Sequence, residues 1–130
     1  MTDADNASRV NSVYVYNDVV YAIGFEIFPT EIRATLWKNG ANITLKYSFS
    51  EAYSIAGFKD NIYIAGQINK NATLWTNRTG DFVDTNLSSI DPSFAKSVFL
   101  TNNDLTLTGV SIVGIVGTNA LTYINNNNTL

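Results

Sequence analysis

The sequence predicts an all-β protein built from three tandem four-stranded antiparallel repeats of about 42 residues each. The first observation behind this prediction is a phrase that returns along the chain. Ala-Thr-Leu-Trp at 34–37 recurs at 72–75 and, in a divergent form, as Ala-Leu-Thr-Tyr at 120–123. Runs of β-branched and aromatic residues surround each copy, and Asn, Gly and Ser fill the gaps between the runs. This composition is typical of strands joined by turns and gives little support to helix.

Two further sets of residues keep the same period. Spacings of 42 and then 43 residues separate the members of both the serine set Ser12, Ser54 and Ser97 and the glycine set Gly24, Gly66 and Gly109. Several landmarks at one period indicate that each repeat is one supersecondary unit. We therefore place a polar lead-in at 1–9 and a single repeat domain at 10–130, with repeats at 10–51, 52–94 and 95–130.

In the first repeat we expect strands at 12–16, 19–25, 34–38 and 43–46. Asn17-Asp18 forms a hairpin turn between the first two strands, because both residue types tolerate the positive φ of tight turns. Pro29 lies in the connection to the third strand, and Asn39-Gly40 is the strongest short hairpin signal in the chain. The repeat is therefore expected to be an antiparallel meander.

The later repeats follow the same order. The second is expected to have strands at 54–58, 62–66, 72–75 and 85–87. In the third, we expect strands at 97–101, 105–109, 120–124 and 128–130, with the apolar segment 110–116 as a long connection.

Composition excludes several classes of function. The chain has 130 residues, a formal net charge of −3 and only 15% charged residues, with no basic run. Nucleic-acid binding lacks its electrostatic basis in such a chain. Histidine and cysteine are both absent, which removes the commonest general base and the thiolate and imidazole metal ligands. We expect a non-catalytic protein without cofactor or metal. No apolar run has membrane-spanning length, so we expect no membrane span.

Two architectures are built from three or more four-stranded units of this size. A β-trefoil closes with three repeats, whereas β-propellers have typically 4–8 blades. Chain length favours the trefoil. Strand patterning favours propeller-type blades, because segments such as 19–25 and 62–66 are continuously apolar, as expected for strands covered on both faces. We take propeller-type blades as the prediction and keep the β-trefoil as the alternative.

The phrase that runs from Ser12-Val13-Tyr14-Val15 through Ala34-Thr35-Leu36-Trp37-Lys38-Asn39-Gly40 resembles blade repeats of bacterial β-propeller proteins. In those repeats, a strand-turn-strand of Val-Tyr-Val-Ala-Gly character precedes an Ala-Thr-Leu-Trp-Lys-Asn-Gly strand. The likeness is strong in the first two repeats and weaker in the third, where Tyr123 replaces the Trp. Many such proteins are secreted or surface-associated, so the resemblance implies an extracellular or cell-surface location. It implies fold far more than function.

The repeat-equivalent residues are expected to be structural. Trp37, Trp75 and Tyr123 share one repeat position, which favours packing between sheets over stacking on a ligand. Gly24, Gly66 and Gly109 are expected where an adjacent backbone comes close. Trp37 and Trp75 should therefore be buried.

Other aromatic residues do not follow the repeat and form the candidate ligand contacts, namely Tyr14, Tyr16, Tyr47 and Tyr53. Carbohydrate is one ligand they could contact, which keeps open a trefoil-like lectin as the alternative function. A third alternative is a glycoside hydrolase using Asp and Glu alone. Glu26 and Glu31, which flank Pro29, are the nearest carboxylate pair in one loop, but solvated loop charge explains them better. The sequence does not identify a ligand.

Self-association is the partner prediction. Three blades do not close a ring at ordinary blade geometry, so the first and last repeats would each leave an apolar sheet face open. Those faces are expected to carry Val13, Val15, Val20 and Tyr21 at one end, and Leu105, Leu107, Ile112, Val113, Ile115 and Val116 at the other. A head-to-tail homodimer would cover both faces in a six-bladed ring.

Overall fold

The computed structural model describes residues 7–78, 80–103 and 105–125 of the chain. These residues form eleven β-strands and no helix. The strands are β1 (Ala7–Tyr16), β2 (Val19–Ile27), β3 (Ile32–Lys38), β4 (Ala41–Thr44), β5 (Ser50–Phe58), β6 (Asn61–Ile68), β7 (Asn71–Thr76), β8 (Val83–Asn86), β9 (Ser93–Asn102), β10 (Leu107–Val116) and β11 (Asn119–Asn125).

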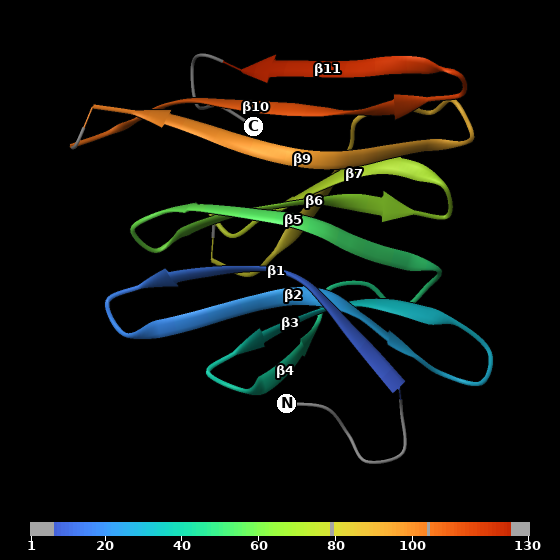
Figure 1. The fold of residues 1–130 in the computed structure, drawn as a ribbon, viewed down its shortest axis with the longest axis horizontal. Helices are drawn as coiled ribbons and strands as arrows, with labels where there is room; N and C mark the ends of the chain where they lie inside the picture. The colour runs from blue at the N-terminus through green and yellow to red at the C-terminus, as the bar shows by residue number, and fades with distance from the viewer. Residues whose placement is uncertain (1–6, 79, 104, 126–130) are drawn as a thin grey trace.

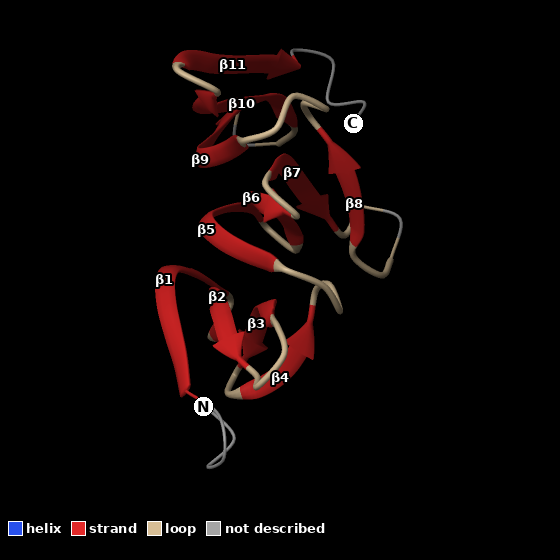
Figure 2. Ribbon diagram, turned by 90° about the vertical axis from the view of Figure 1, so that its right-hand side faces the viewer, coloured by secondary structure: helices blue, strands red, loops and turns tan. Residues whose placement is uncertain are grey.

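The strands form three antiparallel sheets that are stacked face to face (Figure 1). We call them the N-terminal sheet (β1-β2-β3-β4), the middle sheet (β5-β6-β7-β8) and the C-terminal sheet (β9-β10-β11), and in each the strand order follows the chain. Figure 2 shows the first strands β1, β5 and β9 along one side of the stack, with β4 and β8 along the other. Among the described residues, each strand pairs only within its own sheet.

The first two repeats agree with the predicted four-stranded meanders, with strands that extend somewhat beyond the expected ranges. β1 begins at Ala7, so residues 7–9 belong to the first strand and not to a lead-in. The hairpin turns have the expected conformation, since Asn17, Asp18 and Asn39 have φ values of 52°, 64° and 50°. The middle sheet makes one turn without a Gly or Asp, at Asn69 and Lys70, which also have positive φ.

The third repeat differs from its prediction. The segment predicted as a connection, 110–116, is part of the continuous strand β10. Its apolar residues form strand because β10 is the central strand of the sheet and pairs with both β9 and β11. A central strand buries much of both faces and therefore reads as a continuous apolar run. The predicted fourth strand, 128–130, lies outside the described residues.

The three first strands share an irregularity. Asn11, Tyr53 and Lys96 each lie at a register shift in the pairing of β1 with β2, β5 with β6 and β9 with β10. A residue inserted on one strand only is a β-bulge.

On the neighbouring strand, a glycine pairs with the residue just before each bulge. These glycines are Gly24, Gly66 and Gly114. A Cβ at these positions would lie 1.8, 2.1 and 1.9 Å from a backbone carbonyl oxygen of the facing strand. The close backbone approach predicted for the glycine set is therefore present, but its third member is Gly114. The predicted Gly109 pairs with Thr101 instead. Because the apolar run 110–116 belongs to β10, the position that faces the bulge lies five residues further along the chain than predicted.

Two apolar cores lie between the sheets. The first interface, between the N-terminal and middle sheets, contains Ile23, Leu36, Ile55 and Trp75. The second interface, between the middle and C-terminal sheets, contains corresponding residues such as Ala65, Leu74 and Val98, with Tyr123 packed against them.

The aromatic set Trp37, Trp75 and Tyr123 occupies one register position, opposite Ala22, Ile64 and Ile112. Both tryptophans are fully buried, as the sequence predicted, and Tyr123 is half-buried.

Candidate functional site

Candidate functional surfaces include the outer faces of the end sheets and a pocket beside the first strand of the middle sheet. The end faces are best understood from the two interfaces inside the stack. At the first interface, Ser12 Oγ accepts a hydrogen bond from the Ile55 N–H at 3.3 Å. At the second, Ser54 Oγ accepts one from the Val98 N–H, also at 3.3 Å. The third serine of this set is Ser97, and the described residues after its sheet form no further sheet.

A second serine set makes the return contact. Ser50 Oγ accepts the Ala34 N–H at 2.9 Å, and Ser93 Oγ accepts the Ala72 N–H at 2.8 Å. Ser50 and Ser93 are fully buried, and each begins the first strand of its sheet. The bond satisfies a buried N–H of the preceding sheet, which would otherwise be costly to leave unpaired. The N-terminal sheet has Ser8 at this position, in the pattern Ser-x-Val-x-Ser that matches Ser-x-Ala-x-Ser in the other two repeats.

The first strand of the N-terminal sheet displays residues whose counterparts are buried. Val13 is 58% exposed, whereas Ile55 and Val98 at the same position are 8% and 4% exposed. Val10 is likewise exposed, whereas its counterparts Ala52 and Ala95 are fully buried. Within the described part of the chain, no sheet covers this face, whereas the equivalent faces of the middle and C-terminal sheets are each covered by one.

Only part of that face is open. Val15 and Val20 are exposed with Val13, as predicted, but Trp37 on the same face is fully buried. Tyr21 was predicted at the open end and lies instead in the first interface. It pairs with Lys38 and not with the outward-facing Trp37, so the alternation along β2 directs it inward.

The open face of the C-terminal sheet shows the same contrast. Val113 and Ile115 are exposed, whereas Ile23 and Ala65, which occupy the position of Val113, are fully buried. Leu105 is exposed, but it lies in the connection between β9 and β10 and not on the sheet face, which corrects its assignment. Leu107 and Ile112 are buried in the second interface, which corrects their assignment to the open end.

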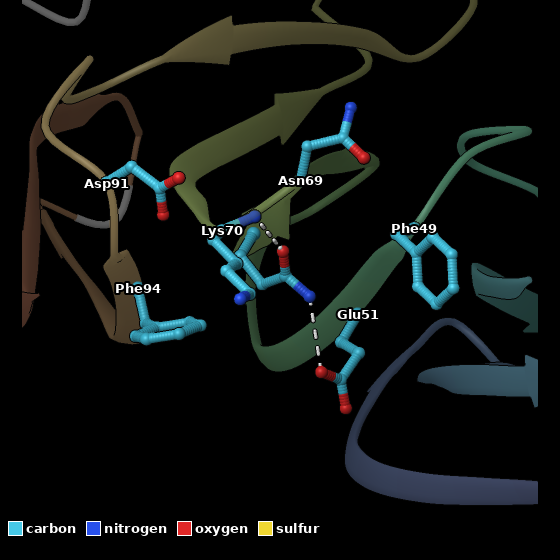
Figure 3. Close-up of a pocket in the computed structure, with 7 residues that line it drawn as sticks. Phe49, Glu51, Asn69, Lys70, Asp91 and Phe94 are labelled. Atoms are coloured by element: carbon cyan, nitrogen blue, oxygen red, sulfur yellow. Dashed lines mark hydrogen bonds between the residues drawn. The ribbon is translucent and has the colours of Figure 1, made fainter.

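The pocket lies between the middle and C-terminal sheets, at the end where β5 begins. It has a volume of about 550 Å³. Its lining comes from the β4–β5 connection, β5, β6, the β6–β7 turn, the segment before β9, and β9, with the residues Phe49, Glu51, Gln67, Asn69, Lys70, Asp91 and Phe94. In Figure 3, Phe49 and Phe94 lie on opposite sides, with Glu51 and Lys70 between them.

Hydrogen bonds fix the polar groups of the pocket. Gln67 Nε2 donates to Glu51 Oε1 at 3.2 Å, and Gln67 Oε1 accepts the Lys70 N–H at 2.7 Å (Figure 3). The Tyr53 hydroxyl donates to the same Glu51 oxygen at 3.2 Å. Burial, and secondly the charge of Glu51, raise the pKa of the Tyr53 phenol well above its ordinary value, so this phenol remains a proton donor at neutral pH.

The predicted ligand-contact tyrosines do not come together. Tyr53 borders the pocket, with its ring edge-on to Phe94 at a centroid distance of 6.5 Å. Tyr14 spans the first interface, where its hydroxyl donates to the Lys59 carbonyl at 3.0 Å. Tyr47 is 70% exposed and lies under the Arg33 guanidinium. Tyr16 ends β1, away from the pocket lining.

The carboxylate pair of the first repeat is engaged elsewhere. Glu26 is buried, and its Oε1 accepts hydrogen bonds from Thr35 Oγ1 at 3.3 Å and Asn42 Nδ2 at 3.1 Å. Glu31 forms an ion pair with Arg33. Glu26 therefore joins β2 to β3 and β4, whereas Glu31 pairs with Arg33. The two carboxylates have separate partners, which gives no support to an acid-base pair.

The pocket lining could not be found from the repeat. Glu51 and Phe94 occupy one repeat position, where the first repeat has Arg9. The bulge residues Asn11, Tyr53 and Lys96 differ in the same way. Residues that change between repeats give no periodic signal, whereas the flanking serines recur. Of these, only the set Ser12, Ser54 and Ser97 entered the prediction.

Within residues 7–78, 80–103 and 105–125, no group of three or more acidic side chains is placed to hold a metal ion. The same residues include no helix that could cross a membrane. Comparison with protein-family models, with curated proteins and with solved structures finds no match for this chain.

Proposed function

We propose that the protein is a non-catalytic β-propeller-type assembly module whose two open sheet faces bind each other in a second copy. Two chains would then form a closed ring of six sheets, within the range of ordinary propellers. The observation that carries this proposal is the exposure of Val13, at 58%, where the equivalent Ile55 and Val98 are 8% and 4% exposed.

The apolar contact of the proposed interface follows from the interfaces already present. Val98 lies in one core with Ala65, and the residues at those positions on the open faces are Val13 and Val113. Head-to-tail contact would place these two valines together. Burying a valine side chain contributes roughly 1.5–3 kcal/mol, so covering the exposed strip would favour association.

The hydrogen bonds of the proposed interface can be derived from those of the interior interfaces. The Val13 N–H occupies the position of the Ile55 and Val98 N–H groups, and Ser97 Oγ occupies the position of their acceptors. In the reverse direction, Ser8 Oγ would accept the Ala120 N–H, as Ser50 and Ser93 accept those of Ala34 and Ala72. Neither Ser8 nor Ser97 has a side-chain hydrogen bond to another described residue, so both are available for this role.

Three features support the propeller over the trefoil. The described strands pair only within their own sheets, whereas a trefoil needs strands of different repeats to close a barrel. First strands lie along one side of the stack, as strands that line a central channel do (Figure 2). The likeness of the repeats to bacterial propeller blades agrees with both.

The mass in solution tests this proposal. Sedimentation equilibrium at micromolar concentration should give twice the chain mass of 14.3 kDa. A stable single-chain species at these concentrations would contradict the dimer, and a series of larger species would indicate head-to-tail growth without closure.

A further inference from the structure

We propose that the pocket beside β5, lined by Phe49, Glu51, Gln67, Asn69, Lys70, Asp91 and Phe94, binds a neutral saccharide of one or two sugar units. The pocket lies within one chain, so this inference does not depend on the proposed dimer. Its volume of about 550 Å³ is in the range of small-molecule sites. The lining combines aromatic rings with a few convergent polar groups, which is the usual composition of such a site.

The polar groups are pre-positioned and only partly used. Gln67 is 6% exposed, and both ends of its amide are bonded within the pocket wall, which fixes Glu51. Both bonds to the Glu51 carboxylate reach Oε1. Among the described residues, Oε2 therefore has no hydrogen-bond partner and can accept from a ligand hydroxyl.

The remaining polar side chains are also available. The Asn69 amide, the Lys70 ammonium and the Asp91 carboxylate make no side-chain hydrogen bond to another described residue, and all three line the pocket. Together with Glu51 they offer acceptors, donors and one group that is both. A sugar hydroxyl donates and accepts, so a polyhydroxylated ligand matches this mixture better than a ligand with acceptors alone.

The aromatic rings supply the apolar part of the site. Phe49 is 54% exposed, so much of its ring is open to a ligand. Phe94 packs against the Tyr53 ring in an edge-to-face geometry, and the Lys96 ammonium lies 5.0 Å from the Phe94 ring centroid. The two rings lie on opposite sides of the polar groups (Figure 3). The electron-rich face of a ring attracts the C–H groups on one face of a sugar.

The charges around the pocket favour neither competing ligand class. Glu51 and Asp91 are balanced by Lys70 in the lining and by Lys96 beside Phe94. A phosphate, a carboxylate or a cationic amine therefore gains no net attraction. A neutral ligand needs none.

The corresponding place at the first interface is different and acts as an internal control. Arg9 stands there in place of Glu51, and its guanidinium lies over Phe25, which stands in place of Gln67, at 6.0 Å from the ring centroid. The serines and glycines of the two places are alike, whereas the residues that would contact a ligand differ. We expect one saccharide site in each chain.

The test is a glycan array of neutral mono- and oligosaccharides, followed by calorimetric titration of the best binder into the full chain. We expect saturable binding with one site in each chain. Phe49→Ala and Glu51→Gln should each weaken binding at least tenfold. Tyr47→Ala is the matched control, because Tyr47 is an exposed aromatic near Phe49 but outside the lining, and it should bind as the wild type does.

Two further titrations, with choline and with inorganic phosphate, complete the experiment. We expect neither to bind. Absence of any saccharide binding by the folded wild-type chain, or saccharide binding that survives both pocket substitutions, would overturn the inference. Binding of choline or phosphate in place of saccharide would overturn it as well. Circular dichroism of each variant separates loss of the pocket from loss of the fold.

Discussion

The interior interfaces and the open end faces are made from the same positions of one repeat, and they differ in what covers them. Ile55 and Val98 are buried against a preceding sheet, whereas Val13 at the same position is exposed. The side-chain type is apolar in all three cases. Valine favours strand in its own right, but its match to two buried apolar positions agrees with our proposal that the end face receives a partner.

The serine hydrogen bonds also distinguish the interior interfaces from the end faces. Each interior interface has one serine that accepts from the following sheet and one that accepts from the preceding sheet. The unused members of the two sets, Ser97 and Ser8, fall at opposite ends of the stack. A contact between the two ends therefore repeats the interior interface, and substitutions at equivalent positions can compare the two.

The largest effect is expected for the core of the first interface. Trp75→Ala should lower the free energy of unfolding by about 3–5 kcal/mol, because it removes a fully buried aromatic side chain. Urea unfolding measures it, with Tyr47→Ala as an exposed control expected within about 0.5 kcal/mol of wild type. A loss below about 1 kcal/mol for Trp75→Ala would mean that the sheets are not held together by this core.

A somewhat smaller effect is expected for the glycine opposite the bulge. In Gly66→Ala the added Cβ would lie 2.1 Å from the Glu51 carbonyl oxygen, so the facing backbone has to move. Overpacking of this kind costs about 2–3 kcal/mol. Gly24→Ala should cost a similar amount, because its Cβ meets the Arg9 carbonyl oxygen at 1.8 Å. Unequal losses in thermal unfolding would show that the end sheet is not equivalent to the middle sheet.

The serine sets provide a sharper comparison of interior and end. Ser93→Ala leaves the buried Ala72 N–H without its acceptor and should cost about 1–2 kcal/mol of unfolding free energy. Ser8→Ala removes the equivalent hydroxyl at the open end. It should leave the unfolding of the dissociated single chain unchanged and weaken self-association, as measured by dilution in sedimentation experiments. Destabilisation of the single chain by Ser8→Ala would contradict the assignment.

The smallest effect concerns pH. Burial and the neighbouring Glu51 carboxylate raise the pKa of Tyr53 in the folded chain, whereas an unfolded tyrosine titrates near pH 10. The unfolded chain therefore releases this proton first, so the contribution to stability is complete below about pH 10 and is lost as the pH rises further. Tyr53→Phe should flatten the decline of the melting temperature above pH 10. Phe49→Ala, which removes no titrating group, should leave the decline unchanged.

Local pattern was enough to predict the sheets of the first two repeats. The hairpins at Asn17-Asp18 and Asn39-Gly40 and the apolar second strands follow from residue types alone, and so does the burial of Trp37 and Trp75. The third repeat was misread because its central strand, β10, is apolar along most of its length. A central strand and a buried connection have the same apolar sequence pattern in this segment. The repeat period also indicated Gly109 as the third member of the glycine set. Only the pairing of β10 with both neighbours identifies Gly114 as the residue opposite the bulge.

The pocket depends on information that no single segment contains. Phe49, Gln67 and Asp91 come from separate parts of the chain and meet only because two sheets stack. Of the four tyrosines considered for ligand contact, only Tyr53 lies beside this pocket. The residues that line the pocket vary between repeats, so a search for recurring residues does not find them. The serine pattern Ser-x-Ala-x-Ser, by contrast, recurs and marks the interface.

The most direct measurement of the central claim, that the two end faces bind each other, is a complementation experiment. Val13→Arg and Val113→Glu each place a charge on one face and leave the other face intact. Sedimentation velocity should show each variant alone as a single chain of 14.3 kDa, because both contacts of its homodimer would bury an unpaired charge. An equimolar mixture should form a dimer, since one contact then joins Arg to Glu and the other is wild type. Failure of the mixture to associate, or dimerisation of either variant alone as tightly as wild type, would contradict the head-to-tail ring.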